Sequence, residues 1–348
     1  MNIKDIAKLA ETSPATVSRV INNDARVSRE MREKVLEIIE KTRYKPNAIG
    51  RSLRSRSSKK LLMVLPTIDN PFYSDIVNGF EEHARKNGFS VLFCVTNRQV
   101  ENERLYYDVL FTRQVDGVAT FIPTITPAEI NKISREYPFV ACCWRGYADI
   151  DVSYVCIDNE KAVMDMMRYL IKLGHTRIAA LNGDYPERTY ERERERGYRR
   201  GLEEAGIPYR PEYYVPCEYG FKAGYAAARR LMSLKEPPTA LFALADDRAA
   251  GVVKFLNENG YHPGVDVDVA GFDDLQVAEI STPTITTVSQ PRYDLGRESA
   301  QLLLSRIDDI SQPNKGVILA HKLIIRDSTR GGKPRPDAPN LLIQAEKG

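Results

Sequence analysis

Apolar positions in the first 45 residues recur every three or four residues, the spacing of helices that bury one face. Three groups have this spacing: Ile3, Ile6, Ala7 and Ala10; Val17, Val20 and Ile21; and Met31, Val35, Ile38 and Ile39. Ser13 and Ser28 are candidate N-caps of the second and third groups, and Pro14 suits the first position of a helix. The pattern predicts three short helices, the last of which ends near Pro46.

From Leu61 onward, short apolar runs alternate with amphipathic helical stretches. The runs are LLMVLP, SVLFCV and GVATFI, followed after about residue 160 by RIAALN, TALFALA and VDVAGFDD. This alternation is typical of βαβ units and parallel sheets. Two such series without a glycine-rich phosphate motif predict two open α/β sheets beside a cleft.

The length of 348 residues suits two or three domains. The amino terminus is polar, with no signal peptide, and no apolar window reaches the roughly 18 residues of a membrane span. We therefore expect a cytoplasmic protein that does not contact a membrane. Five cysteines without C-x-x-C spacing and four scattered histidines predict reduced thiols, with no metal and no cofactor.

The net charge of +3 is divided unevenly along the chain. Residues 1–60 contain 15 Lys and Arg against 7 Asp and Glu, a net charge of +8, whereas the remainder contains 35 against 40, a net charge of −5. A basic end on a mildly acidic body is expected when that end contacts a polyanion.

The first two predicted helices have the spacing of a helix-turn-helix, whose second helix can lie in the major groove of DNA. Burial of the apolar stripe leaves five residues of the second helix facing outward: Ala15, Thr16, Ser18, Arg19 and Asn22. An ordinary three-helix cap with a solvated face is the alternative interpretation.

Three segments carry a resemblance to a known family: IKDIAKLAETSPATVSRVINN, VSREMREKVLEIIEKTRYKPN and RSL. They resemble the DNA-binding head of the LacI/GalR family of bacterial transcription regulators, and the similarity continues to about Arg330. The resemblance implies that Pro14, Ala15 and Thr16 occupy base-reading positions and that Arg19 is a base-contact candidate. Pro14 and Ala15 lack hydrogen-bonding side chains. Direct readout of bases therefore depends on Thr16, on Arg19 and on apolar contact with thymine methyl groups.

The linker PNAIGRSLRSRSSKK reads on its own as a flexible tether. In the family the matching segment forms a hinge helix on DNA, and the residue matching Leu53 wedges between base pairs of the minor groove. Gly50 replaces the alanine common there and disfavours helix by roughly 1 kcal/mol. The DNA contacts that the resemblance implies are Ser13, Pro14, Ala15, Thr16, Ser18, Arg19, Asn22, Asn47, Arg51 and Leu53.

Ligands of open parallel sheets lie beyond the carboxyl ends of the strands, so residues that directly follow strands are candidate ligand contacts. Phe72 and Tyr73 follow the first strand of the body, Asp246 follows FALA, and Asp273 and Asp274 follow VAGF. Singly, each is more often a capping or packing residue. At equivalent ends of several strands, they indicate a binding site.

The segment PERTYERERERGYRRG, from Pro186 to Gly201, contains six arginines and four glutamates. Helical spacing places Tyr190, Arg194 and Tyr198 on the stripe that packs against the sheet. The outward-facing arginines, Arg192, Arg196 and Arg199, have glutamates three or four residues away, which predicts a solvated face. Arg194, at the open end of the inward stripe, is the strongest candidate for ligand contact.

The resemblance also implies an effector site. Arg194 and Asp273 match common effector contacts, Arg188 and Tyr190 match positions of purine-binding relatives, and Tyr219 and Trp144 match wall positions. Ala245 stands where several sugar-binding members have asparagine, and Cys143 where aspartate is frequent. The full expected set is Phe72, Tyr73, Trp144, Arg188, Tyr190, Arg194, Tyr219, Asp246 and Asp273.

The expected fold class is a small all-α helix-turn-helix head plus an α/β periplasmic-binding-protein-like body of two doubly wound parallel-sheet subdomains. The expected divisions are a head (1–46), a hinge (47–60), an N-terminal subdomain (61–160 with 292–321), a C-terminal subdomain (161–291 with 322–330) and a flexible tail (331–348). Three crossings join the subdomains, near 159–162, 289–292 and 320–323.

The leading hypothesis is a transcription regulator, most simply a repressor, that is controlled allosterically by a small molecule, and not an enzyme. It would bind a near-palindromic double-stranded operator as a homodimer, because the tail lacks the heptads of a tetramerising helix. A sugar or sugar derivative is the preferred effector and a nucleoside or purine the rival. An enzyme acting on a sugar or nucleoside lacks a supporting motif, and a transport-binding protein is disfavoured by the basic head.

Overall fold

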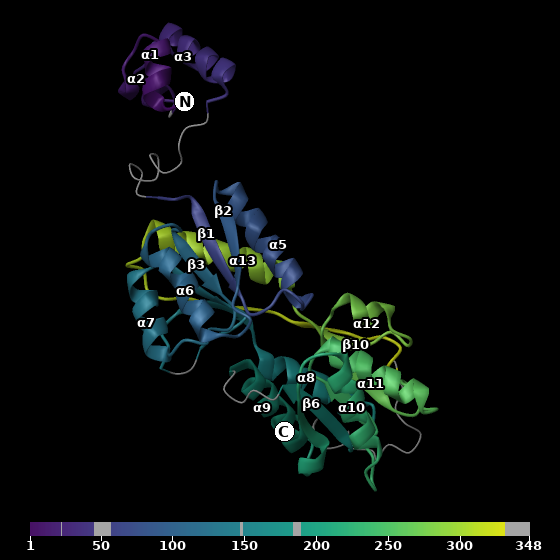
Figure 1. The fold of residues 1–348 in the computed structure, drawn as a ribbon. Coiled ribbons are helices and arrows are strands. Elements are labelled where there is room, and N and C mark those ends of the chain that lie inside the picture. The colour runs from purple at the N-terminus through teal and green to yellow at the C-terminus, as the bar shows by residue number, and fades with distance from the viewer. Residues whose placement is uncertain (22, 45–56, 147–148, 184–188, 331–348) are drawn as a thin grey trace, which may run out of the picture.

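The computed structural model describes residues 1–21, 23–44, 57–146, 149–183 and 189–330. They form a helical head and a body of two α/β subdomains (Figure 1). The expectations for Asn22, Asn47, Arg51, Leu53 and Arg188 lie outside the described residues.

The head contains the three helices that the apolar spacing predicts: α1 (Ile3–Leu9), α2 (Pro14–Ile21) and α3 (Arg29–Thr42). Ile6, Val17 and Val35 are buried together where the helices meet. Both predicted caps are confirmed, since the Ser13 hydroxyl accepts from the Thr16 amide at 3.1 Å and Ser28 accepts from the Met31 amide at 3.4 Å. These hydrogen bonds satisfy amides that the start of a helix leaves unpaired.

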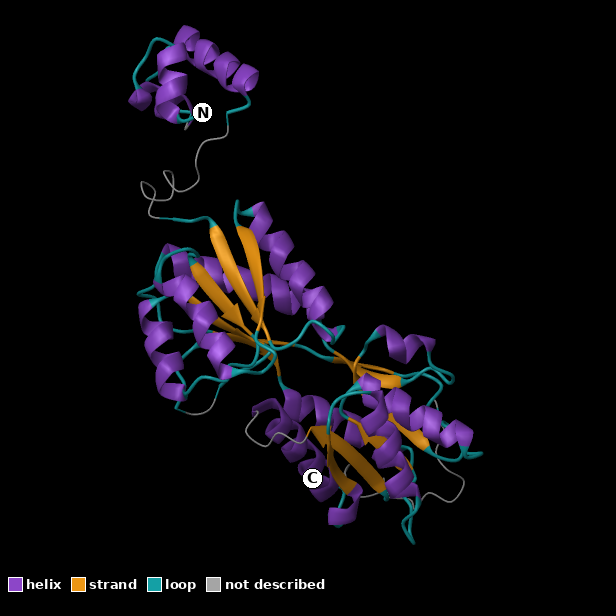
Figure 2. Ribbon diagram, viewed as in Figure 1, coloured by secondary structure: helices purple, strands orange, loops and turns teal. Residues whose placement is uncertain are grey.

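The N-terminal subdomain is a parallel sheet covered by helices, in the strand order β11-β5-β4-β3-β1-β2 (Figure 2). Its strands are β1 (Lys60–Leu65), β2 (Ser90–Val95), β3 (Gly117–Thr120), β4 (Phe139–Cys142), β5 (Ser153–Ile157) and β11 (Gly316–Leu319). Its helices are α5 (Phe72–Lys86), α6 (Val100–Phe111), α7 (Pro127–Glu136) and α13 (Arg292–Asp308).

The C-terminal subdomain repeats this plan in the order β12-β10-β9-β8-β6-β7. Its strands are β6 (Ile178–Gly183), β7 (Tyr214–Cys217), β8 (Ala240–Ala243), β9 (Asp268–Asp273), β10 (Thr286–Ser289) and β12 (Lys322–Ile324). Its helices are α8 (Asn159–Lys172), α9 (Thr189–Glu204), α10 (Phe221–Met232), α11 (Asp246–Glu258), α12 (Gln276–Ile280) and the short 3₁₀ helix η1 (Pro211–Tyr213). The edge strand β12 runs antiparallel to β10, whereas the other pairs are parallel.

The chain passes between the sheets after β5, after β10 and after β11. The second passage sends α13 back onto the N-terminal subdomain, where it packs along α5. Two glycines make this approach close, because a Cβ atom on Gly79 would lie 2.0 Å from the Tyr293 carbonyl oxygen and one on Gly296 would lie 1.9 Å from that of Ile76. The pairing thus joins segments about 200 residues apart in the sequence.

Candidate functional site

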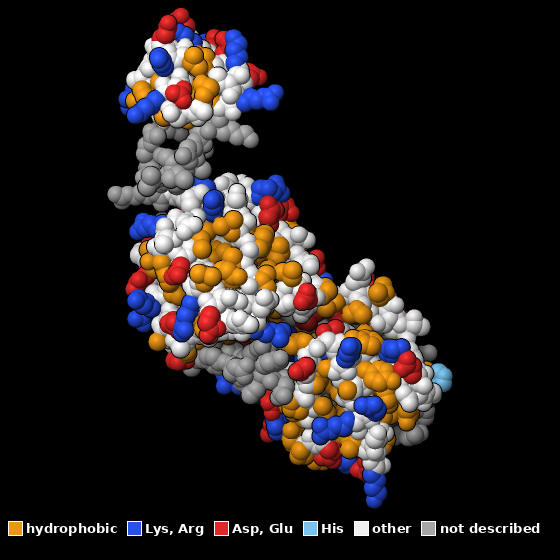
Figure 3. Space-filling view, in the orientation of Figure 1, with side chains coloured by type: hydrophobic (Ala, Val, Ile, Leu, Met, Phe, Trp, Pro, Cys, Tyr) orange, Lys and Arg blue, Asp and Glu red, His pale blue; other side chains and the backbone are white. Residues whose placement is uncertain are grey.

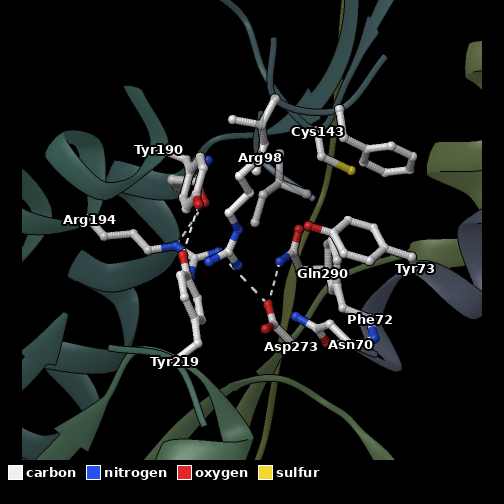
Figure 4. A pocket seen from close by; sticks show the side chains of 14 residues that line it. Asn70, Phe72, Tyr73, Arg98, Cys143, Tyr190, Arg194, Tyr219, Asp273 and Gln290 are labelled. Atoms are coloured by element: carbon white, nitrogen blue, oxygen red, sulfur yellow. Dashed lines mark hydrogen bonds and ion pairs between the residues drawn. The ribbon is translucent and has the colours of Figure 1, made fainter. Parts of the chain in front are cut away.

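A pocket lies between the subdomains, where strands of both sheets end. Its volume is about 60 Å³, and several of its side chains converge on Asp273 (Figure 4). The lining residues are Asn70, Phe72, Tyr73, Arg98, Phe121, Ile122, Cys143, Ile157, Asn159, Tyr190, Arg194, Tyr219, Asp273 and Gln290. Both subdomains and two of the passages between them, at Asn159 and Gln290, therefore contribute residues to one pocket.

Arg194 projects from α9 into this pocket and is 7% exposed. Its Nε donates to Asn159 Oδ1 at 3.1 Å, and its Nη1 donates to the Leu244 carbonyl oxygen at 2.9 Å. Its guanidinium carbon lies 3.9 Å from the centre of the Phe272 ring, a favourable cation–π distance. These contacts fix the plane of the guanidinium and leave Nη2 3.8 Å from the Asp273 carboxylate.

Asp273 ends β9 and is the acidic group of the pocket. Gln290 donates to its Oδ1 at 2.7 Å, and Arg194 faces the same oxygen at 3.8 Å (Figure 4). Burial raises the pKa of Asp273 to about 6, against the lowering effects of Arg194 and Gln290. Its φ of 106° lies in a region that is costly for a residue with a side chain. A carboxylate held in this way can accept hydrogen bonds from ligand hydroxyl or N–H groups.

A chain of buried polar groups supports Arg194. Asn159, at the start of α8, accepts from Arg194 through Oδ1 and donates from Nδ2 to Glu193 Oε2 at 3.1 Å. The other Glu193 oxygen accepts from Arg145 of the N-terminal subdomain at 2.5 Å. The position of Arg194 is therefore coupled to the first passage and to both subdomains.

Aromatic rings form the remaining walls. The hydroxyl groups of Tyr190 and Tyr219 lie 2.8 Å apart, and Tyr219 donates to Glu191 at 2.6 Å. On the opposite subdomain, the Phe72 and Tyr73 rings meet edge to face at 5.4 Å. Such surfaces suit a ligand with flat apolar faces and a polar rim.

Six of the nine expected effector residues line the pocket: Phe72, Tyr73, Tyr190, Arg194, Tyr219 and Asp273. Trp144 and Asp246 do not. Trp144 is 5% exposed and packs in the core of the N-terminal subdomain. Asp246 is fully buried beneath the pocket, where it accepts from the Thr287 hydroxyl at 2.6 Å and from the Leu275 amide at 2.7 Å. Asp246 stabilises the loop after β9, and burial raises its pKa.

The outward arginines of α9 are solvated, as their spacing predicts. Arg192, Arg196 and Arg199 are exposed, and Arg199 pairs with Glu195 at 2.8 Å. Glu191 and Glu193, for which the spacing made no prediction, are each only 2% exposed. Both carboxylates bind side chains around the pocket, as described above.

Sequence reasoning missed four polar residues of the pocket: Asn70, Arg98, Asn159 and Gln290. Asn70 and Arg98 lie in the loops after β1 and β2, so the rule that singled out Phe72 and Tyr73 could have found them. Asn159 and Gln290 lie at passages between the sheets, and no local spacing indicates their role. Cys143 also lines the pocket, and burial raises the pKa of its thiol.

In the head, the expected reading positions lie at the start of α2. Pro14, Ala15 and Arg19 are exposed, and the Thr16 hydroxyl lies 3.0 Å from that of Ser13. Ser13 therefore caps the helix in addition to its expected role, and Ser18 is half-buried on the same helix.

Among the described residues, no cluster of three or more His, Cys, Asp or Glu side chains could hold a metal ion. No helix in the described ranges is long and apolar enough to cross a membrane.

Comparison with protein families gives two matches in this chain. Residues 2–47 match the bacterial regulatory proteins of the lacI family, and residues 167–329 match a periplasmic binding protein-like domain. The chain is 32% identical over 330 residues to the HTH-type transcriptional repressor CytR of Escherichia coli K12, covering 94% of this chain and 96% of that protein.

Solved structures agree with these matches. The complex of the transcriptional regulator CelR with cellobiose is 30% identical, with a TM-score of 0.71, and covers 94% of this chain and 99% of that chain. The lac repressor dimer bound to operator and the anti-inducer ONPF has a TM-score of 0.86 at 23% identity over the same shares, which shows the common fold. The chain therefore belongs to the LacI family of bacterial transcription regulators, which are DNA-binding repressors with an effector-binding core and not enzymes.

Proposed function

We propose that this chain represses transcription from a near-palindromic operator and that a small molecule in the pocket around Asp273 controls the repression. The observation that carries the proposal is that both subdomains, and two of the passages between them, contribute residues to the pocket. A ligand that binds one arrangement of the subdomains better than another shifts the population toward it.

A sugar or sugar derivative is the effector class that we favour. Arg194, Asp273, Asn159 and Gln290 supply donors and acceptors in the pocket, and the aromatic rings supply apolar faces. This combination suits a hydroxylated ring with apolar C–H faces. The CelR relative was solved with cellobiose. The density of aromatic rings favours a nucleoside or purine as the second candidate.

In the proposed complex, α2 enters the major groove, with Pro14, Ala15, Thr16 and Arg19 toward the bases and Ser13, Ser18 and Asn22 toward the phosphates. Residues 47–60 act as the hinge, in which Asn47, Arg51 and Leu53 contact the minor groove. We propose divisions at 1–46 for the head, 61–160 with 292–321 for the N-terminal subdomain and 161–291 with 322–330 for the C-terminal subdomain, supported by the order of the helices and strands.

Two heads are needed for a near-palindromic site, and we propose a homodimer formed through β2. This strand is an edge of its sheet, and its Leu92 and Phe93 are 39% and 43% exposed. Hydrophobic side chains gather on the visible face of the N-terminal subdomain (Figure 3). An apolar edge strand of this kind favours association with a second chain. The lac repressor was solved as a dimer on its operator.

An electrophoretic shift with genomic fragments tests the operator-binding proposal. We expect sequence-specific binding by the full chain and none by a variant that lacks residues 1–58, which retains both sheets. Specific binding by the truncated variant would exclude the head as the DNA-binding element. Because the proposed partner is genomic DNA, we place the regulator in the cytoplasm.

Thermal-shift screening of sugars, sugar acids, nucleosides and purines tests the effector proposal, because a ligand that binds only the folded state raises the Tm. The compound that raises the Tm should also change operator affinity. A compound that raises the Tm without altering operator binding would be a ligand but not an effector.

A further inference from the structure

The chain enters the body at residues 57–59, and one carboxylate holds all three residues. Asp116, which directly precedes β3, accepts through Oδ2 from the Ser57 hydroxyl and from the Lys59 amide, the latter at 3.0 Å. Its Oδ1 accepts from the amide and the hydroxyl of Ser58, at 2.7 and 2.8 Å. Because a carboxylate offers about four acceptor positions, these four donors fill Asp116. We call this set of contacts the linker joint.

The neighbouring strand also holds Lys59. Its carbonyl oxygen accepts from the Ser90 amide of β2 at 3.0 Å, and its ammonium group lies 4.3 Å from the centre of the Phe89 ring. Lys59 has a φ of 52°, a conformation that is uncommon for a residue with a side chain. Contacts on both sides thus hold a backbone bend that a free chain rarely adopts. Residues 57–59 are therefore fixed to the body, although they lie within the proposed hinge.

The linker joint limits the length of the connection between each head and the body. The last described residue of the head is Tyr44, so the joint leaves residues 45–56 to connect the two. Release of residues 57–59 would lengthen this connection by three residues, which span at most about 10 Å when extended. That distance equals about three base pairs along a duplex.

In the proposed dimer, the distance between the two heads must match the distance between the half-sites of the operator. A connection that is too short cannot span the half-sites, and a longer one tolerates a wider range of spacings. We propose that Asp116, as the acceptor of the linker joint, sets the half-site spacing that the regulator accepts. In this role Asp116 is a positioning residue, and DNA contact stays with the head and the hinge. The inference rests on the proposed function, because it requires two heads on one operator.

Asp116→Asn opens the linker joint with little change in side-chain size. The amide has one acceptor oxygen, and its nitrogen is a donor that would face donors of the linker, so at least two of the four hydrogen bonds are lost. Ser58→Ala removes one donor and keeps the charge of Asp116, so it separates the effect of the joint from the effect of charge. Asp108→Asn is the control, because it removes the same charge from an exposed residue of α6 in the same subdomain.

Limited trypsin digestion of the full chain tests the linker joint without DNA or effector. Cleavage after Lys59 requires the surrounding residues to leave the body by local opening. We expect the fragment that begins at Lys60 to form at least about tenfold faster in Asp116→Asn than in wild type, because opening no longer has to break the full joint. The rate should rise severalfold in Ser58→Ala and stay unchanged in Asp108→Asn. Intact mass identifies the fragment, and thermal melting checks that each variant is folded.

Fluorescence anisotropy with operators of different spacing tests the proposed role. The probes are a genomic fragment that the full chain binds in the electrophoretic shift, and the same fragment with two base pairs inserted at its centre. We expect the insertion to lower wild-type affinity at least about tenfold, because the second head no longer reaches its half-site, and to lower that of Asp116→Asn about threefold or less. Asp108→Asn should behave as wild type. A role in stability alone would weaken binding to both fragments by the same factor.

Three outcomes contradict the inference. Cleavage after Lys59 that is equally slow in wild type, Asp116→Asn and Ser58→Ala would mean that other contacts hold the linker. The inference also fails if the joint opens in Asp116→Asn and the insertion still lowers the affinity of both proteins by the same factor. If the full chain binds no genomic fragment, the proposed function fails and the spacing role fails with it, whereas the digestion still decides whether Asp116 holds the joint.

Discussion

Arg292 holds Asp75 through two hydrogen bonds to one carboxylate oxygen, from Nε at 3.0 Å and from Nη2 at 2.7 Å. Asp75 belongs to α5 of the N-terminal subdomain, whereas Arg292 follows the second passage and also donates through Nη1 to the carbonyl oxygens of Asp273 and Asp274. Asp273 and Asp274 both have positive φ angles, 106° and 55°. One guanidinium thus joins α5 to the backbone that carries the Asp273 side chain.

Arg292→Lys should weaken the coupling between effector and operator, because an ammonium group cannot make this forked set of contacts. We expect effector and operator affinities, measured separately, to stay within about threefold of wild type. The factor by which saturating effector changes operator affinity should fall about tenfold or more, within the usual range of coupling energies. Fluorescence anisotropy of labelled operator, with and without effector, measures this factor.

Arg297→Lys is the control for that experiment, since Arg297 lies on the same helix and, within the described residues, its ion pairs are local ones with Asp294 and Glu298, both at 2.9 Å. An unchanged coupling factor in Arg292→Lys would mean that the Asp75 contact only stabilises the fold.

Effector binding should depend on the charge of Asp273. Its pKa is raised to about 6, so the carboxylate is ionised above that pH and protonated below it. If ligand hydroxyl groups donate to the carboxylate, affinity is constant above about pH 7 and falls as the pH drops through 6. In Asp273→Asn the affinity should be lower and independent of pH between 5 and 8. A wild-type affinity that does not change over this range would exclude the ionised carboxylate as an acceptor.

Asp273 also makes the stability of the free protein depend on pH, in the direction opposite to that of effector affinity. The folded pKa of about 6 lies above the ordinary value of 3.8, so between these two pH values the folded chain holds a proton that the unfolded chain releases. The contribution of Asp273 to stability is therefore largest below about pH 4 and is lost as the pH rises through 6. Asp273→Asn should raise the unfolding free energy of the free protein more at pH 8 than at pH 5, by about 1.4 kcal/mol, which a comparison of Tm values at the two pH values detects. Equal changes at both pH values would contradict the raised pKa.

Arg194→Ala should abolish the thermal shift produced by the effector. The change removes a donor to the ligand and also leaves Asp273 and Asn159 without their arginine partner. We expect at least about a hundredfold loss of affinity by calorimetry, in line with the cost of removing one partner from a buried charged group. Arg196→Ala, an exposed arginine two residues away on the same helix, is the control and should bind normally. An unchanged shift in Arg194→Ala would remove Arg194 from the site.

Phe93→Asp should convert the proposed dimer to a monomer and weaken operator binding, because a carboxylate on an apolar edge cannot be buried unpaired. Light scattering after size exclusion gives the mass, and anisotropy gives the affinity. Phe111→Asp is a matched control, since both phenylalanines are 43% exposed and Phe111 is not on β2. A Phe93→Asp variant that remains dimeric would place the interface elsewhere.

Much of this architecture follows from short-range patterns. Ser13 and Ser28 were identifiable as caps because a hydroxyl group directly before a helix has a local partner. Arg194 could be assigned to the inward face of its helix, and Arg196 and Arg199 to the outward face, because helical periodicity alone distinguishes the two faces. The burial of Glu191 and Glu193 was not predicted, because it depends on partners from other segments, Tyr219 and Asn159.

The pocket could be predicted only in part, because its polar centre is assembled across the passages. Asn159 and Gln290 are 131 positions apart and meet the pocket from different connections between the sheets. Asp246 directly follows a strand, as an effector contact would, but its carboxylate turns inward to Thr287 and Leu275. Which way a side chain turns at a strand end depends on partners from distant segments, and spacing along the chain does not contain that information.

The close packing of α13 on α5 has a consequence for synthesis on the ribosome. The first five strands of the N-terminal subdomain are complete by Ile157, but its helix α13 and its edge strand β11 are made only after the whole series from β6 to β10. Until then the surface of α5 around Gly79 is uncovered, and β5 lacks its outer neighbour. The nascent chain must keep this unfinished N-terminal subdomain soluble while the C-terminal subdomain is translated. A premature stop after β10 would leave the N-terminal subdomain without α13 and β11.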